Sequence, residues 1–259
     1  MKNRKIWVML VGLFTALTSG FMGTTLTFAE ENEASQTIEQ PSYISDFPNQ
    51  VGHWQDLVGT AEKKNDSTGL WIANTKQGTN LESVSINLDA REQSSGDLEL
   101  TFLYEGQSNF GLVFRGDKQK TSQWQSFAYN RDGRWQLGQP GGKWLTNIPG
   151  PTLLSGQQYK LLVRYDGKKI QTFLNDQLFY ENEEVHYPDG TSINDDWTGA
   201  IGIRLFGNLS KLNIISMKSG SVGSIPVIDS SAEYRELKEK WRNQLVSKEY
   251  DSTNQIGRA

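Results

Sequence analysis

Along much of this chain, hydrophobic residues occupy every second position, which is the period of a β-strand with one buried face. The clearest case is residues 109–116, which read Asn-Phe-Gly-Leu-Val-Phe-Arg-Gly. A similar run follows at residues 124–130, and Asp132-Gly133 supplies a turn before the next run, because the turn needs a residue that tolerates positive φ. We therefore predict an antiparallel meander over residues 109–144.

The same pattern recurs over residues 51–218 and predicts a succession of short strands. Turn-forming pairs such as Asp166-Gly167, Asn175-Asp176 and Gly207-Asn208 separate them. Many short strands with regular turns are typical of two packed antiparallel sheets, so the predicted fold class is an all-β, two-sheet antiparallel sandwich. The strands are expected near residues 52–58, 70–74, 81–91, 97–105, 110–116, 124–130, 134–138, 158–166, 170–174, 177–181, 199–206 and 209–217.

The N-terminal 50 residues depart from this pattern. Residues 1–29 have a positively charged start, an apolar middle and Thr27-Phe28-Ala29 at their end, as expected for a signal peptide cleaved after Ala29. A retained membrane anchor is the alternative, although glycines and hydroxyl residues weaken it. Residues 30–50 are acidic and rich in Ser, Gln and Asn, so we predict a disordered linker there.

The C-terminal end changes character again. Residues 219–229 read as a linker of small residues, and Ser230-Ser-Ala-Glu233 has the sequence of a capping box that opens a helix. An apolar stripe then recurs with helical spacing at Tyr234, Leu237, Trp241 and Leu245. Because one isolated helix cannot bury such a stripe, it either docks on the sandwich or belongs to a helical domain, of which residues 230–259 would be the incomplete start.

Composition and charge narrow the function classes. The chain contains no cysteine, which excludes disulfides and thiolate metal sites and suits Gram-positive export. A net charge of −4 argues against a general nucleic-acid binder. Residues 115–144 nevertheless carry six Lys or Arg residues against two Asp, which would attract an acidic polysaccharide. The alternative is a solvated face whose charges serve solubility alone.

Three segments together resemble a known group of folds. They are Gly-Leu-Val-Phe-Arg at 111–115, the two-turn stretch at 159–180, and Gly-Ala-Ile-Gly-Ile-Arg-Leu-Phe at 199–206. These segments resemble the concanavalin-like (laminin-G-like) jelly-roll sandwiches, and more narrowly the carbohydrate-binding modules of bacterial fructanases and related secreted glycan-degrading enzymes. The resemblance covers roughly residues 83–217 and implies a jelly roll, a fold that hosts lectins, enzymes and adhesion domains alike.

A second resemblance concerns the predicted helix. Residues 234–251 read Tyr-Arg-Glu-Leu-Lys-Glu-Lys-Trp-Arg-Asn-Gln-Leu-Val-Ser-Lys-Glu-Tyr-Asp, which is similar to the opening helix of the family-eight polysaccharide lyases of hyaluronate, chondroitin and xanthan. This implies an N-terminal part of such a lyase, truncated before its catalytic domain. The Asn, His, Tyr and Arg that transfer the proton in those lyases lie far downstream, so no catalytic residue is assigned.

Signals for catalysis are weak in the rest of the chain. No Walker loop, His-Glu-x-x-His or Gly-x-Ser-x-Gly motif occurs in the sequence, and the two histidines lack metal or triad spacing. Glu183-Glu184 and Asp195-Asp196 are paired carboxylates that a glycosidase could use across a sugar, but charges in polar loops are usually solvated. We predict no metal and no cofactor; a structural calcium beside Asp195-Asp196 is compatible with the residue types, but the spacing does not support it.

Aromatic and cationic side chains of the meander are the candidate ligands for a sugar. An indole offers an apolar face and one N–H donor, and an arginine can hold a carboxylate with two hydrogen bonds. Rings beside polar residues, glycines or turns are expected to be exposed, whereas inward packing is the alternative for each. The predicted carbohydrate-binding residues are Arg115, Trp124, Tyr129, Arg134, Trp135, Trp144 and Trp197.

The leading hypothesis is a secreted, non-catalytic carbohydrate-binding module that keeps a hyaluronate-lyase-like enzyme close to its polymer. The expected partner is a polysaccharide such as hyaluronan or another uronate-containing glycan, with no nucleic acid and no membrane contact after signal cleavage. Two alternatives stay open. One is a glycoside-processing enzyme that uses loop carboxylates on the jelly roll, and the other is a surface adhesion domain that binds host matrix protein.

Overall fold

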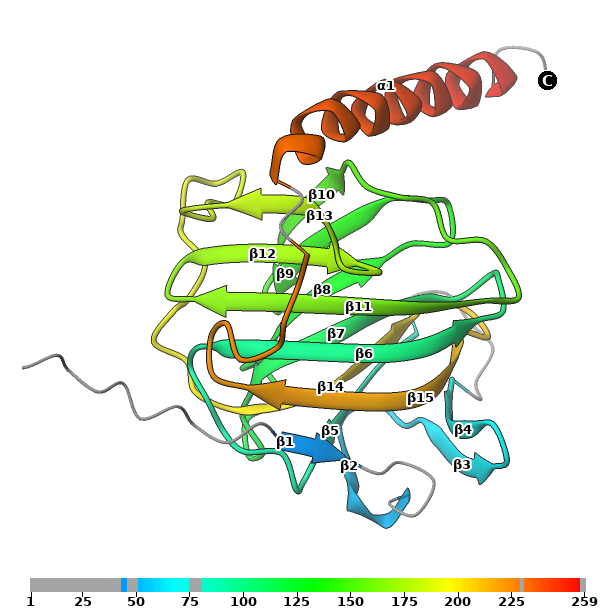
Figure 1. The fold of residues 1–259 in the computed structure, drawn as a ribbon. Coiled ribbons are helices and arrows are strands. Elements are labelled where there is room, and N and C mark those ends of the chain that lie inside the picture. The colour runs from blue at the N-terminus through cyan, green and yellow to red at the C-terminus, as the bar shows by residue number, and fades with distance from the viewer. Residues whose placement is uncertain (1–42, 46–50, 75–80, 229–230, 257–259) are drawn as a thin grey trace, which may run out of the picture. The chain divides into compact units, whose positions relative to one another are not determined.

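The computed structural model describes residues 43–45, 51–74, 81–228 and 231–256. Two antiparallel sheets and one C-terminal helix make up its regular structure (Figure 1). The predicted all-β sandwich is therefore confirmed. The predicted signal peptide at residues 1–29 and most of the predicted linker at 30–50 lie outside the described residues.

The two sheets, which we call sheet A and sheet B, have eight and seven strands. Sheet A has the order β13-β12-β11-β6-β15-β4-β3, with β1 also paired to β15, and sheet B has the order β10-β9-β8-β7-β14-β5-β2. Sheet A consists of β1 (Tyr43–Ser45), β3 (Glu62–Asp66), β4 (Gly69–Ala73), β6 (Gly96–Tyr104), β11 (Gln157–Asp166), β12 (Lys169–Leu174), β13 (Gln177–Asn182) and β15 (Lys211–Gly220). Sheet B consists of β2 (Trp54–Val58, preceded by the 3-10 turn η2 at Val51–His53), β5 (Glu82–Asn87), β7 (Asn109–Gly116), β8 (Gln125–Tyr129), β9 (Trp135–Gln139), β10 (Lys143–Ile148) and β14 (Ala200–Phe206).

Three of these strands, β1, β3 and β10, are absent from the sequence prediction. β3 reads Glu-Lys-Lys-Asn-Asp, in which no apolar residue marks a buried face. β10 pairs with β9 through a register shift that interrupts any simple alternation. β1 falls inside the segment predicted as a disordered linker, where residues 43–45 pair with residues 217–219 of β15.

Side chains at alternate strand positions fill the space between the two sheets. In β7 the rings of Phe110 and Phe114 lie 4.8 Å, centroid to centroid, from those of Phe102 and Tyr165 in sheet A. The prediction that Phe110 and Phe114 face the core is confirmed, but the expectation of only one buried face is wrong, because every residue of β7 from 110 to 116 is buried. Gly111, which alternates with the two phenylalanines, therefore faces away from sheet A.

Residues 221–225, which we call the strap, are hydrogen-bonded to sheet A. The carboxylate of Asp97 is fully buried and accepts hydrogen bonds from the Arg164 guanidinium at 2.7 and 2.8 Å. It also accepts from the backbone N–H groups of Gly223 and Ile225, at 3.2 and 3.0 Å. The hydrogen bonds between Asp97 and Arg164 raise the pKa of Arg164. The backbone bonds fix the path of the chain beyond β15.

The helix α1 (Ser231–Ile256) docks on β13, an edge strand of sheet A (Figure 1). Tyr234 and Trp241 of its predicted stripe are both buried. The Tyr234 hydroxyl accepts the backbone N–H of Glu181 at 3.2 Å, and the Trp241 ring meets Phe179 edge-on at 6.2 Å. These two residues of the stripe therefore dock on the sandwich, where they cover part of an otherwise open sheet edge.

Candidate functional site

Trp135 and Tyr129, both predicted to bind sugar, are buried in the core, with 0% and 1% of their surface exposed. The indole N–H of Trp135 donates to the carbonyl of Pro151 at 2.9 Å, and the Tyr129 hydroxyl accepts the backbone N–H of Leu153 at 3.0 Å. Burial raises the pKa of Tyr129. The prediction that the Trp135 ring stands outward is wrong, because β9 presents this position to the space between the sheets.

Arg115, predicted to hold a ligand carboxylate, instead connects loops inside the protein. Its guanidinium is fully buried and donates to the carbonyls of Ser94 at 2.6 Å, Gly167 at 2.8 Å and Asn194 at 3.2 Å. Burial lowers the pKa of Arg115. With these bonds formed to the protein itself, the side chain is not available to a ligand, and its role is to hold three loops together at one end of the sandwich.

The charges of the predicted basic segment are largely matched by acidic neighbours. The Lys118 and Lys120 ammonium groups lie 3.4 Å from carboxylate oxygens of Glu92 and Asp117, respectively. Arg134, which is half-buried, pairs with Asp132 and donates to the Asn147 side chain at 3.1 Å. Lys143 lies 4.0 Å from Asp189. The basic segment therefore forms a surface of exposed ion pairs, each of which contributes little to the stability of the fold.

Trp124, Trp144, Arg204 and Phe206, which we call the aromatic patch, lie together on the outer face of sheet B. The central carbon of the Arg204 guanidinium is 4.2 Å from the ring centroids of both Trp144 and Phe206, and 5.6 Å from that of Trp124. Trp124 is buried, so the prediction of an exposed ring is wrong for it, whereas Trp144 and Phe206 are half-buried. Sequence reasoning found Trp144 but missed Arg204 and Phe206.

Strand register explains why these side chains meet. Trp144 of β10 pairs with Gly138 of β9, and Arg204 of β14 pairs with Gly111 of β7, so all four positions share the face turned away from sheet A. A Cβ atom on Gly138 would overlap the Trp144 ring. The glycine therefore allows the indole to lie flat on the sheet. The alternation Ile-Arg-Leu-Phe at 203–206 is the sequence signal that could have placed Arg204 on this face.

The electrostatics of the patch depend on a buried cation. Only 7% of the Arg204 surface is exposed, and its Nε donates to Glu82 at 2.5 Å. Burial lowers the pKa of Arg204, while the Glu82 charge opposes that shift. Among the described residues, Arg204 Nη1 and the hydroxyl of Ser126, which is on the same face, have no hydrogen-bond partner. The patch thus combines two partly exposed rings with polar groups that can still accept or donate a bond.

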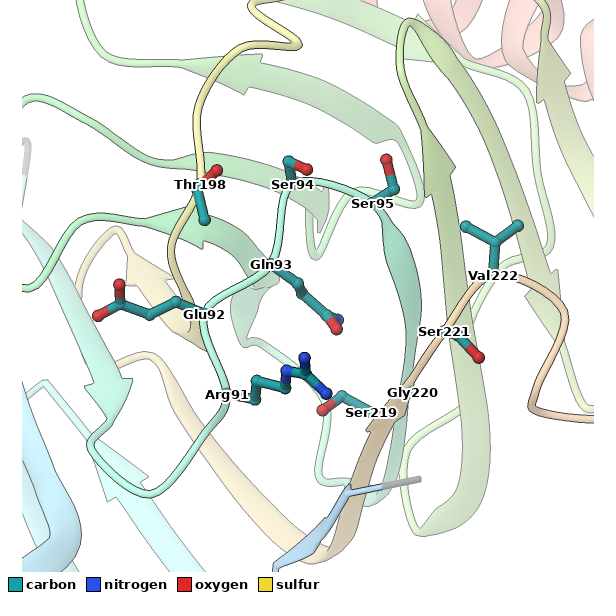
Figure 2. A pocket seen from close by; sticks show the side chains of 10 residues that line it. All are labelled: Arg91, Glu92, Gln93, Ser94, Ser95, Thr198, Ser219, Gly220, Ser221 and Val222. Carbon is teal, nitrogen blue, oxygen red and sulfur yellow. The ribbon is translucent and has the colours of Figure 1, made fainter. Parts of the chain in front are cut away.

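A cavity of about 400 Å³, which we call the rim pocket, opens at the end of the sandwich where Arg115 holds the loops (Figure 2). It is formed by the loop between β5 and β6, by Thr198 before β14 and by the end of β15 with the start of the strap. Figure 2 shows Arg91, Gln93 and Ser219 pointing toward one another, while Glu92 points away. Trp197, another predicted ligand, is half-buried beside Thr198.

Hydrogen bonding gives the rim pocket a defined interior. The Gln93 side-chain amide donates to the Tyr165 hydroxyl at 2.9 Å, and its backbone pairs with Gly199 at 3.0 Å. The Ser219 hydroxyl is buried and has no hydrogen-bond partner in the described part of the chain. This pocket was not predicted, because its residues come from three segments far apart in the sequence.

Across 43–45, 51–74, 81–228 and 231–256, no group of three or more His, Asp or Glu side chains is placed to hold a metal ion. Within those ranges, no helix has both the length and the apolar content required to cross a bilayer.

Comparison with known proteins connects the chain to one enzyme and one fold. No protein-family model matches it. The chain is 98% identical over 255 residues to hyaluronate lyase HylB of Enterococcus faecalis (strain ATCC 700802 / V583), a match that covers 98% of this chain and 25% of that protein. The chain thus spans about a quarter of the length of the curated relative it matches. This near-identity confirms the predicted resemblance to the hyaluronate lyases.

Two solved structures from Bacillus subtilis superpose on part of the chain. A protein of unknown function with a galectin-like fold superposes with a TM-score of 0.54 at 14% identity, over 69% of this chain and 94% of that one. The carbohydrate-binding module CBM66 superposes with a TM-score of 0.45 at 16% identity, over 61% of this chain and 94% of that one. The first of these supports the sandwich architecture.

Proposed function

We propose, from the near-identity to part of a hyaluronate lyase, that this chain is a non-catalytic carbohydrate-binding module of a hyaluronate-lyase-like protein. The observation that carries the proposal is the 98% identity over 255 residues. A protein that acts on hyaluronate must hold a long polymer of alternating sugars, half of which carry a carboxylate. The module would bind that polymer, or a related uronate-containing glycan.

The aromatic patch supports this proposal because it suits the apolar face of a sugar ring. Trp144 and Phe206 present partly exposed rings. The central carbon of the Arg204 guanidinium lies 4.2 Å from the centroid of each ring and packs against both. Rings already held in position lose little entropy when a ligand stacks on them. Arg204 Nη1 and the Ser126 hydroxyl, which have no hydrogen-bond partner among the described residues, lie on the same face. After a small shift of the rings, each would form a hydrogen bond with water or with a sugar hydroxyl.

The attachment of the helix suggests how binding would serve an enzyme. The strap is anchored to Asp97 and α1 is docked on β13, so the chain leaves the sandwich in a fixed direction. A module joined stiffly to a catalyst keeps bound polymer at a defined distance and raises its local concentration. The proposed role is therefore to position the polymer as well as to retain it.

Affinity electrophoresis of the full chain through gels that contain hyaluronan tests the proposal. We expect Trp144→Ala to weaken retention about tenfold or more, because loss of one buried aromatic anchor typically costs about 2 kcal/mol. Trp71→Ala is the matched control, since Trp71 is also half-buried and also stacks on a cation, with Lys211 Nζ 5.1 Å from its ring. Equal retention of the wild type and Trp144→Ala would remove the patch as the binding surface. No retention of the wild type would remove the function.

We also propose that the chain is exported, with residues 1–29 acting as a signal peptide. The positive start, the apolar middle and the small residue Ala29 support this. Intact-mass analysis of protein from the culture medium of a Gram-positive host is expected to give a chain that begins at Glu30. Recovery only from cell membranes with residues 1–29 still attached would support a retained anchor instead.

A further inference from the structure

We propose that the rim pocket is a second saccharide site, which holds one sugar unit that bears a carboxylate. The inference rests on the proposed function for its ligand class, a uronate-containing glycan, but it uses residues separate from the aromatic patch. The rim pocket and the patch would then contact different units of a polymer, or different polymers.

The chemistry of the walls points to a polar ligand. The cavity holds about 400 Å³ and is lined by an arginine, a glutamate, a glutamine, four serines, one threonine, a glycine and a valine, with no aromatic ring among its lining residues. A pocket of this kind cannot stack on a sugar face. It can surround the hydroxyl-bearing edge of a sugar with donors and acceptors, and its size fits a single ring.

Two donors converge where a carboxylate would sit. Arg91 and Ser219 point toward each other from opposite walls (Figure 2). Ser219 is 1% exposed, and its hydroxyl has no hydrogen-bond partner among the described residues, so it is free to bond a ligand atom. The neighbouring carboxylate of Glu92 points away from the cavity and lies 3.4 Å from Lys118, which reduces its repulsion of an anion.

Gln93 gives the pocket an acceptor for sugar hydroxyls. Its amide nitrogen is already engaged with the Tyr165 hydroxyl at 2.9 Å, which leaves the carboxamide oxygen as the acceptor. The carboxamide is held in place by its contact with a fully buried tyrosine. An ordered acceptor beside two donors suits a hydroxy acid, whose carboxylate accepts and whose hydroxyl donates, whereas a sulfate or halide ion has no proton to donate.

The walls are fixed before any ligand arrives. Arg115 holds the loop carbonyl of Ser94 at 2.6 Å, and Asp97 holds the strap through Gly223. The pocket therefore does not have to be assembled on binding, which reduces the entropic cost of capturing a single sugar unit.

The test is an NMR titration of the ¹⁵N-labelled full chain with two matched probes, methyl β-D-glucuronoside and methyl β-D-glucoside. They differ only in a carboxylate against a hydroxymethyl group. We expect the glucuronoside to shift the backbone amides of residues 93–95 and 219–222 and to bind about tenfold more tightly than the glucoside. Arg91→Gln should weaken glucuronoside binding about tenfold and leave the glucoside unchanged, and Ser219→Ala should weaken it about threefold.

Arg242→Gln is the matched control, because Arg242 is an exposed arginine on α1 that pairs with Glu239. It should change neither affinity. The inference is overturned if these amides do not move, if both glycosides bind equally, or if sodium acetate binds as tightly as the glucuronoside. If the titration fails in one of these ways while the chain is still retained by hyaluronan through Trp144, only the rim pocket is removed as a site. Hyaluronan retention that does not depend on Trp144, together with a positive titration, would remove the patch alone.

Discussion

The aromatic patch stands on the strands of sheet B, whereas the rim pocket lies where strands end and loops begin. The patch combines half-buried rings with a buried arginine whose charge is matched by Glu82. The rim pocket contains serines, a threonine, an amide and Arg91, and its shape depends on loops held by Arg115. One sandwich thus supplies an apolar platform through strand register and a polar cavity through loop anchoring.

The largest effect is expected from Asp97→Ala, which should break the rim pocket and spare the patch. The change removes the acceptor for four hydrogen bonds and leaves Arg164 without its carboxylate. We expect a loss of about 3–5 kcal/mol in the free energy of unfolding, measured by urea denaturation. Below its unfolding temperature the variant should lose glucuronoside binding but keep hyaluronan retention. Undiminished glucuronoside binding would show that the strap does not shape the pocket.

Gly138→Ala should have the opposite selectivity. The new methyl group would overlap the Trp144 ring, so the indole must move off the sheet. We expect about 1–3 kcal/mol of destabilisation from this overpacking and about tenfold weaker retention on hyaluronan gels, with glucuronoside binding unchanged. Gly52→Ala is the control, since a Cβ atom there meets nothing within 4 Å. Full retention by Gly138→Ala would mean that the position of the Trp144 ring does not matter.

High pH should destabilise the sandwich through its buried tyrosines. Burial raises the pKa of both Tyr129 and Tyr165 above the ordinary value, so each ionises more readily in the unfolded chain. Their contribution to stability is therefore complete below about pH 10 and falls as the pH rises toward the folded-state pKa, by ~1.4 kcal/mol per pH unit for each tyrosine.

Urea denaturation of Tyr165→Phe between pH 10 and 12 tests this. The free energy of unfolding of the variant should fall less steeply with pH than that of the wild type, because one ionising tyrosine is missing. An identical slope for the two proteins would contradict the argument. At neutral pH the same variant removes the acceptor that holds Gln93, so it should weaken glucuronoside binding about threefold without changing hyaluronan retention.

The smallest effect is expected from replacing Lys118, Lys120 and Lys143 together with Gln. Each lies within 4.0 Å of a carboxylate, so their charges are already matched locally. Retention on hyaluronan gels at about 0.15 M salt should fall less than threefold, because exposed ion pairs are screened under these conditions. A loss comparable with that of Trp144→Ala would make charge, and not the rings, the main source of affinity.

The sequence was sufficient for the sandwich because alternation is a local property. Phe110 and Phe114 revealed which face of β7 is turned toward sheet A, although both faces of that strand are buried, and Asp166-Gly167 correctly marked the turn between β11 and β12. The same reasoning missed β3, whose polar residues at an edge of sheet A need no apolar partner. Local patterning therefore predicts strands that bury side chains and overlooks strands that mainly complete a sheet.

The functional surfaces depend on contacts that no local pattern contains. Trp135 follows a turn and precedes a polar residue, as an exposed ring would, yet β9 turns it into the core beside Tyr129 at 4.8 Å. Arg115 appeared to be a ligand for a carboxylate, but carbonyls from positions 94, 167 and 194 surround it. Trp144 alone among the predicted tryptophans of the meander remains partly exposed, and Gly138 beneath it is the reason it can stack on Arg204.

Direct observation of the tryptophan indole N–H signals during titration with hyaluronan oligosaccharides tests the central claim, that the sandwich binds polysaccharide through the ring of Trp144. Indole signals can be assigned by single Trp→Phe variants. We predict that the Trp144 signal moves in proportion to bound ligand, while those of Trp71 and Trp135 stay in place. The claim is contradicted if the Trp144 signal does not move under conditions where the oligosaccharide is bound, or if the Trp71 signal moves in its place.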